Sequence, residues 1–161
     1  MKRMFCFLLL PIVFGCGKSD DELRKMMREE ISKTAERSYF TNAQVIGPYS
    51  PAVRVGSMLF ISGQIGINQE TTELVGDDIE SQTRQALMNL RSILMEAGCD
   101  SNDVVQCSVF LKDIKDFTKM NLIYGGFFSQ GQYPARTTVE VSNLPKNAKV
   151  EIAAIAIRAK S

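Results

Sequence analysis

Apolar and polar residues alternate along most of the chain in the way that is typical of short β-strands. Two apolar runs, around residues 52–55 and 58–62, are separated by Gly56-Ser57, which predicts a hairpin. A later run, residues 104–111, alternates strictly, which predicts that Val105, Cys107, Val109 and Leu111 lie on one face of a strand. In all, strands are predicted at residues 32–38, 52–55, 58–62, 104–111, 135–141 and 149–158.

Two other segments show the spacing of an amphipathic helix. The first begins near Asp77 and Asp78, whose carboxylates suit a helix N-terminus, and ends at Gly98. The second runs from about residue 116 to residue 128, although Gly125-Gly126 inside it disfavours a helix. Strand and helix patterns therefore alternate along the second half of the chain.

The last predicted strand is apolar on both faces apart from Glu151. In so small a domain, such a strand is expected to be covered by helices on one side and by another subunit on the other. The pattern therefore predicts an α+β fold, in which a single mixed β-sheet carries two helices on one face and the chain assembles into an oligomer.

The N-terminus has a different pattern. A positively charged start precedes an apolar stretch, residues 4–14, that is too short to span a bilayer but suits the core of a signal peptide. The segment Val13-Phe14-Gly15-Cys16 is similar to a bacterial lipobox, so residues 1–15 are expected to be a lipoprotein signal peptide and Cys16 to be lipidated. The protein is then expected to be a membrane-anchored lipoprotein that faces the periplasm or the exterior.

Two alternatives for this leader stay open. The apolar stretch could form a buried N-terminal strand, or translation could start at Met26 or Met27, which would make the protein cytoplasmic. Residues 16–31 are dense in charge and are interpreted as a tether, either helical or disordered. Residues 32–161 are expected to form the folded domain.

Composition narrows the possible chemistry. The 161 residues include no histidine, which excludes Ser-His-Asp triads, Cys-His pairs and His-ligated metals, and no metal site is expected. With 19 Lys and Arg against 18 Asp and Glu, the chain lacks the basic excess of most nucleic-acid-binding domains. Without a histidine to activate them, Cys99 and Cys107 are interpreted as small buried residues.

Three places along the chain are candidates for chemistry. Glu151 puts a carboxylate where the strand pattern calls for an apolar side chain, which indicates either a functional group or a structural salt bridge. Arg136 begins a strand and is its natural partner; its guanidinium suits capture of a carboxylate, although an arginine at such a place is often a surface residue. Ser62-Gly63 ends a strand with small residues that let a ligand approach the backbone.

Taken in order, several motifs form a more specific pattern: Ile46-Gly47-Pro48-Tyr49-Ser50, Ile61-Ser62-Gly63-Gln64-Ile65, Asn121, and the segment 134–157. Together they resemble the RidA/YjgF-type reactive intermediate (imine) deaminase family, over about residues 32–158. The resemblance implies a chorismate mutase-like fold and a homotrimer with three ligand clefts at its subunit interfaces. It also implies cofactor-independent hydrolysis of enamines and imines, such as 2-aminoacrylate, 2-iminopropanoate and 2-iminobutanoate, to 2-keto acids and ammonia.

The resemblance also implies roles for particular residues. Arg136 would bind the carboxylate of the substrate, and Glu151 would activate or position the attacking water. The other residues implied to contact the substrate or support the site are Tyr49, Ser62, Gly63, Asn121 and Thr138.

Two positions depart from the pattern of the family. Thr138 stands where many active members have a cysteine, and Ala153 stands where a second glutamate is common. Neither change is expected to abolish the site. The alternative to an enzyme is a non-catalytic trimeric module that binds small carboxylates or a protein partner and keeps Arg136 as its clamp. A ribonuclease, a third possibility, is disfavoured by the nearly neutral charge.

Overall fold

In the computed structural model, the structure describes residues 19–34, 36–43 and 45–158. The expected signal peptide, residues 1–15, and the expected lipidation site at Cys16 lie outside these residues. The chain divides between residues 33 and 34 into two compact units. Within the described part of the chain, no helix is both long and apolar enough to cross a membrane.

Helix α1, Asp20–Thr34, belongs to the first unit except for its last residue. A capping box fixes its start: the Glu22 N–H donates to the Ser19 hydroxyl oxygen (3.3 Å), and the Ser19 N–H donates to the Glu22 carboxylate (2.9 Å). No Gly or Pro follows to end the helix early, so it continues through Thr34. The strand predicted at 32–38 is therefore wrong in its first half, and strand β1 is Arg37–Phe40.

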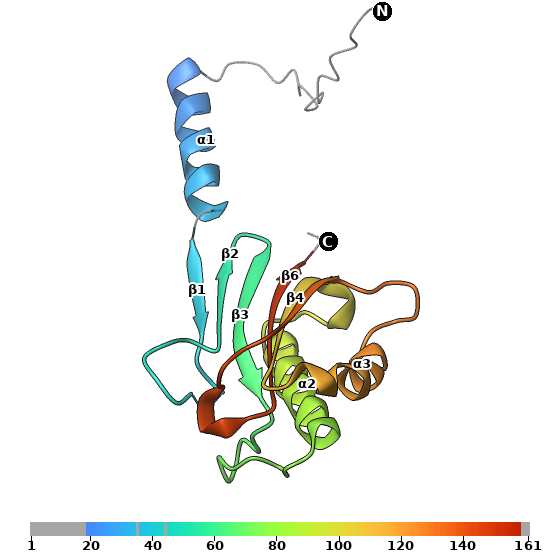
Figure 1. Ribbon diagram of the computed structural model, residues 1–161. Helices are drawn as coiled ribbons and strands as arrows, with labels where there is room; N and C mark the ends of the chain where they lie inside the picture. Colours follow the sequence, from blue (N-terminus) through green and yellow to red (C-terminus); the bar gives the residue numbers. More distant parts are fainter. Residues whose placement is uncertain (1–18, 35, 44, 159–161) are drawn as a thin grey trace, which may run out of the picture. The chain divides into compact units, whose positions relative to one another are not determined.

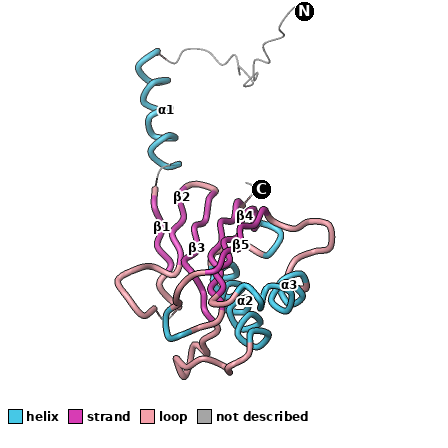
Figure 2. The backbone as a smooth tube through the Cα atoms, viewed as in Figure 1, coloured by secondary structure: helices cyan, strands magenta, loops and turns pink. Residues whose placement is uncertain are grey.

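The second unit is built on one six-stranded mixed sheet (Figures 1 and 2), with the strand order β1-β2-β3-β6-β4-β5. Strands β4 and β5 are parallel, and the other neighbours are antiparallel. The remaining strands are β2 (Ala52–Val55), β3 (Met58–Ile65), β4 (Val104–Leu111), β5 (Ala135–Glu140) and β6 (Val150–Ile157). The predicted mixed sheet is confirmed, and β3 extends three residues beyond its predicted end.

Helix α2, Ile79–Glu96, packs against β3 and β6 and lies beside α3, as Figure 1 shows. Its predicted ends are correct: the Asp78 carboxylate accepts from the Ser81 N–H (2.7 Å), and Gly98 has a φ of +68° just beyond the last turn. Apolar residues of both helices and of the sheet form one continuous core. The α+β fold with two helices on one face of the sheet is therefore confirmed.

Helix α3, Phe117–Gly125, is shorter than predicted. A 3₁₀ turn at Ile114–Asp116 precedes it, and its last residue is the first glycine of the Gly125-Gly126 pair. The predicted helix over 116–128 is too long because two consecutive glycines disfavour the continuation of a helix. Two further 3₁₀ turns lie at Ser101–Asp103 and Pro145–Asn147.

A β-bulge in β4 overturns one predicted side-chain direction. Val104 pairs with Ala156 and Gln106 with Ile155, so Val105 is an extra residue between these two pairs. Val104 is buried, and Val105 is 42% exposed on the other face. The expectation that Val105 shares a face with Cys107 is therefore wrong. Cys107 is fully buried, and Cys99 is also buried, which agrees with the reading of both as small core residues.

Strand β6 is buried on one face only. Val150, Ile152, Ala154 and Ala156 point toward the helices and are buried, whereas the alternate residues are half-buried or exposed. The other face of the sheet presents large apolar side chains that are about 40% exposed, namely Phe60, Val139 and Val105. Cover of this face by another subunit stays a prediction.

Candidate functional site

Glu151 lies near the start of β6, against an irregular part of β3. The two strands pair regularly up to Ile61 and then shift register, so that Gln64 pairs with Ile152 and Ile65 with Glu151. Gly63 lies in this irregular stretch of β3, between the two registers. A Cβ at Gly63 would stand only 2.6 Å from Glu151 Cδ and would overlap the carboxylate. The glycine therefore provides the space in which the Glu151 side chain lies.

The loop before β2 closes one side of this site. The Ser62 hydroxyl donates to the Ser50 carbonyl (2.7 Å), and the Ser62 N–H donates to the Pro51 carbonyl (2.9 Å). The same loop turns tightly at Tyr49, whose N–H donates to the Gly47 carbonyl (2.9 Å). These bonds hold the Tyr49 ring beside the cavity that is described next. One of them uses the Ser62 hydroxyl as the donor of a structural hydrogen bond.

The resulting cavity, here called the Glu151 cavity, has a volume of about 310 Å³. It is lined by Ile46, Tyr49, Ser62, Gly63, Ile65, Pro145 and Glu151. Among the described residues, no cation lies within ion-pairing distance of Glu151, so the structural salt bridge considered for it is absent. Burial without a compensating charge raises the pKa of the Glu151 carboxyl. A carboxyl group of this kind can bind water and take part in proton transfer.

Arg136 lies in a different cavity, at the parallel edge strand β5. Its guanidinium stands over the rings of Tyr124 (4.5 Å from Cζ to the ring centroid) and Phe117 (5.6 Å), both from α3. The Arg136 cavity has a volume of about 410 Å³ and is lined by Asn121, Tyr124, Gly125, Tyr133, Pro134 and Arg136. Its polar groups can hold an anion beside the rings of Tyr124 and Tyr133.

Thr138 follows Arg136 by two residues and therefore lies on the same face of β5. Its hydroxyl oxygen is buried and has no hydrogen-bond partner in the described part of the chain. It does not line the Arg136 cavity in the single chain. Asn121, by contrast, does line it, and its side chain is exposed.

Arg136 and Glu151 lie on opposite faces of the sheet. Arg136 is paired in register with Cys107, whose side chain is buried toward the helices. Glu151 is paired with Phe110, which alternates with the helix-facing residues of β4. Paired residues point to the same face, so the carboxylate and the guanidinium point to opposite sides. The expectation that Arg136 partners Glu151 is wrong within one chain.

The predicted residues thus separate into two groups. Tyr49, Ser62 and Gly63 join Glu151, whereas Asn121 joins Arg136. Sequence reasoning missed the aromatic residues around Arg136, above all Tyr124. The signal for it was present, because Tyr124 follows Asn121 by three residues and a helix puts such residues on one face.

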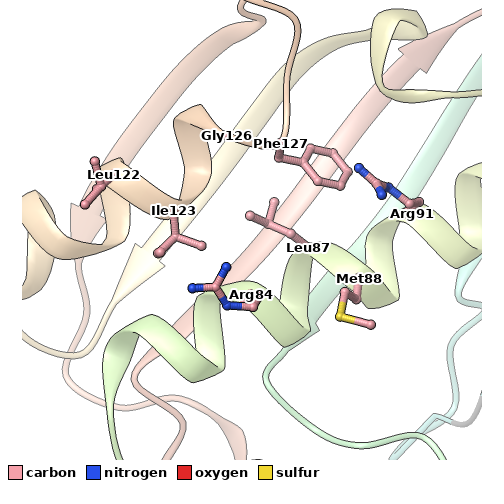
Figure 3. Close-up of a pocket in the computed structure, with 8 residues that line it drawn as sticks. All are labelled: Arg84, Leu87, Met88, Arg91, Leu122, Ile123, Gly126 and Phe127. Carbon is pink, nitrogen blue, oxygen red and sulfur yellow. The ribbon is translucent and has the colours of Figure 1, made fainter.

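A third hollow lies between α2 and α3 (Figure 3) and has a volume of about 260 Å³. Its apolar floor, with Leu87 and Ile123, is flanked by Arg84 and Arg91, and Arg91 stands over the Phe127 ring (5.0 Å). None of the residues predicted for the site lines this hollow. Among the described residues, no group of three or more Cys, Asp or Glu side chains is placed to hold a metal ion.

Most of this chain is similar to known proteins. Residues 40–158 match the sequence model of the family described as Endoribonuclease L-PSP. A RutC family protein of Pyrococcus abyssi is 50% identical over 113 residues, which cover 70% of this chain and 88% of that protein. The mouse protein named 2-iminobutanoate/2-iminopropanoate deaminase is 46% identical over 113 residues, covering 70% of this chain and 83% of that protein.

Solved structures of other proteins also match the fold of this chain. The crystal structure of the Escherichia coli YjgF gene product matches with a TM-score of 0.69 and 42% identity, over 74% of this chain and 98% of that one. The structure of Escherichia coli TdcF with bound serine matches with a TM-score of 0.69 and 41% identity, over 73% of this chain and 93% of that one.

Proposed function

Because this chain belongs to the RidA/YjgF/RutC family, we propose that it hydrolyses reactive enamines and imines of 2-imino acids to 2-keto acids and ammonia. Two relatives, 43% and 46% identical, are named 2-iminobutanoate/2-iminopropanoate deaminase. The observation that carries the proposal is the Arg136 guanidinium, which stands in a cavity without an acidic partner among the described residues. An unpaired cation of this kind suits the carboxylate of a small substrate.

In the proposed reaction, Arg136 binds the carboxylate of the substrate and Glu151 orients the attacking water. The water adds to the carbon of the protonated imine while the Glu151 carboxylate accepts a proton, which gives a neutral carbinolamine. The protonated carboxyl then returns this proton to the nitrogen. The C–N bond breaks as the Glu151 carboxylate takes the proton of the new hydroxyl group, which releases ammonia and leaves the keto acid. The imine is already electrophilic, so orientation supplies most of the catalysis and no cofactor is required.

We also propose that the protein is a homotrimer whose clefts lie at the subunit interfaces. Such a cleft would combine the Arg136 cavity of one subunit with the Glu151 cavity of the next. Two observations support this arrangement: Arg136 and Glu151 lie on opposite faces of the sheet, and the face that carries Glu151 has exposed apolar residues, among them Phe60. Thr138, with its unpartnered hydroxyl, and Asn121 would belong to the Arg136 side of the cleft.

A second candidate function is binding of small carboxylates without catalysis. The relative TdcF, whose structure is described with bound serine, favours this alternative. Arg136 would have the same role in both functions, whereas Glu151 would be needed only for hydrolysis. The two functions therefore differ in what they require of Glu151.

The test is to generate 2-iminopropanoate or 2-iminobutanoate with an amino-acid oxidase and to follow the release of ammonia and keto acid. The wild type is expected to accelerate release over buffer, and Arg136→Ala and Glu151→Ala are each expected to lose most of that acceleration. Arg84→Ala, which removes an arginine from the hollow of Figure 3, is the matched control and should act like the wild type. No acceleration by the wild type would contradict the enzyme function.

The expected cellular location is a separate proposal. We propose that the protein is a lipoprotein anchored through Cys16 after removal of residues 1–15, on the strength of the leader pattern alone. Cells that express the full chain and are fed radioactive palmitate should yield labelled protein, and Cys16→Ser should abolish the label. Unlabelled wild-type protein would instead favour translation from Met26 or Met27.

A further inference from the structure

Arg136 is held by aromatic rings instead of by an acid. Its guanidinium carbon lies 4.5 Å from the centroid of the Tyr124 ring and 5.6 Å from that of Phe117. In the described part of the chain, the side chain of Arg136 makes neither an ion pair nor a hydrogen bond. The side chain is half-buried, so it is held in place at the cavity by these two rings and by its strand.

Support by aromatic rings, in place of an acidic side chain, affects what the Arg136 guanidinium can bind. An aspartate or glutamate would bind the guanidinium through its N–H groups and would neutralise its charge. An aromatic ring instead attracts the cation through the electrons of its face and uses none of those donors as a conventional hydrogen bond. The rings can therefore fix the position of Arg136 while its charge and its N–H groups stay available to a carboxylate.

Of the two rings, Tyr124 is the more firmly fixed. It is 3% exposed in the last turn of α3, and its ring lies 4.9 Å from that of Phe128, which in turn lies 5.0 Å from Phe127. Phe117 is 37% exposed at the start of the same helix. Tyr124 is therefore the fixed support, and Phe117 is a second, outer contact.

The hydroxyl of Tyr124 does not explain why the residue is there. The oxygen is buried beside the Cys107 thiol, a weak hydrogen-bonding group, and no nitrogen or oxygen partner for it lies within the described residues. Burial raises the pKa of Tyr124 far above its ordinary value, so the phenol stays neutral and offers no negative charge to Arg136. The contact with the guanidinium is consequently made by a neutral ring face.

We propose that Tyr124, assisted by Phe117, is a positioning residue that holds the Arg136 guanidinium ready for the carboxylate of the substrate. The inference rests on the proposed function for the identity of that carboxylate. It assigns to α3 a role that the motifs of the chain do not reveal, because the ring acts on the substrate only through Arg136.

The experiment compares Tyr124→Phe, Tyr124→Leu and Phe117→Leu with the wild type. Two quantities are measured: KM and kcat for the imine, and the dissociation constant of the unreactive keto acid 2-oxobutanoate by calorimetry. Tyr124→Leu is expected to raise both KM and the dissociation constant about 3- to 30-fold, the range of a cation–π contact, with a smaller change in kcat. Phe117→Leu should give a weaker effect in the same direction.

The conservative variant and a control separate positioning from folding. Tyr124→Phe keeps the ring and should bind 2-oxobutanoate as tightly as the wild type. Leu122→Ala, at a 79% exposed position of α3, should change nothing. Equal weakening by Tyr124→Phe and Tyr124→Leu would overturn the inference, because the hydroxyl would then be responsible. If Tyr124→Leu does not fold, Phe117→Leu at its exposed position decides, and wild-type affinity in that variant overturns the inference.

The binding measurement also keeps the two proposals apart. A wild type that binds 2-oxobutanoate but hydrolyses no imine would contradict the proposed reaction, and the ring variants would still test the support of Arg136. A wild type that hydrolyses the imine but shows the same dissociation constant with and without the ring would overturn only the positioning role. Failure of the wild type to bind the keto acid overturns the positioning role as well.

Discussion

At the scale of single residues, the position of the Glu151 side chain depends on Gly63. A half-buried, unpaired carboxylate is unfavourable, and it is possible here because the missing side chain of Gly63 leaves room for it. The sequence revealed Glu151 as a carboxylate within an apolar strand, and it revealed Gly63 only as a place of close approach. That the two residues fill one space depends on the register between β3 and β6, which is a property of the folded sheet.

The raised pKa of Glu151 predicts opposite effects of pH on activity and on stability. In the proposed reaction, Glu151 must be ionised to accept a proton from water, so kcat is expected to rise with pH through a pKa above the ordinary glutamate value. The folded chain favours the protonated form, so the contribution of Glu151 to the free energy of unfolding falls as pH rises from the unfolded to the folded pKa.

A kcat profile and urea unfolding over the same pH range would measure both trends. Glu151→Gln cannot ionise and is therefore expected to lose the acid limb of kcat along with most activity, and to flatten the fall in stability. A Glu151→Gln protein that kept the same acid limb would assign the titration to another group.

At the scale of elements, the sequence correctly predicts those features that residues close together in the chain determine. The cap at Asp78 and the glycine at position 98 define both ends of α2, and both are visible in the sequence. The bulge at Val105 is different, because it depends on how β4 pairs with β6 and leaves the alternation of apolar residues almost unchanged. The strand predicted at 32–38 failed for a related reason, since short polar segments fit the end of a helix as well as an edge strand.

The same distinction applies to the candidate site. Six of the thirteen residues that line the two cavities were identified individually, by small size, charge or resemblance. Their division into two groups was not, because strand order and pairing decide which face each side chain takes. Tyr124 was missed since an aromatic residue on an apolar helix face has the same pattern as a core residue, and it is indeed buried.

At the scale of the whole molecule, the placement of Arg136 and Glu151 on opposite faces predicts complementation between inactive variants. Arg136→Ala and Glu151→Ala subunits, each inactive alone, should regain activity when they are unfolded together and refolded as a mixture. If each cleft takes one half from each of two subunits, random assembly gives roughly a quarter of the wild-type activity. Assembly measured by light scattering should report trimers for every sample.

Refolding each variant separately and then mixing the samples briefly is the control, and this mixture should stay inactive while the subunits do not exchange. No recovery after joint refolding, in samples that do assemble, would place both residues of a working site in the same subunit.

If the protein assembles as proposed, the two-faced arrangement of the sheet would also make activity depend on the concentration of the protein. If a single subunit presents only half of each site, newly made chains are inert, and turnover begins only when their concentration exceeds the dissociation constant of the assembly. Specific activity would then fall on dilution instead of staying constant. A cell could silence such an enzyme by lowering its copy number, without altering any residue of the site.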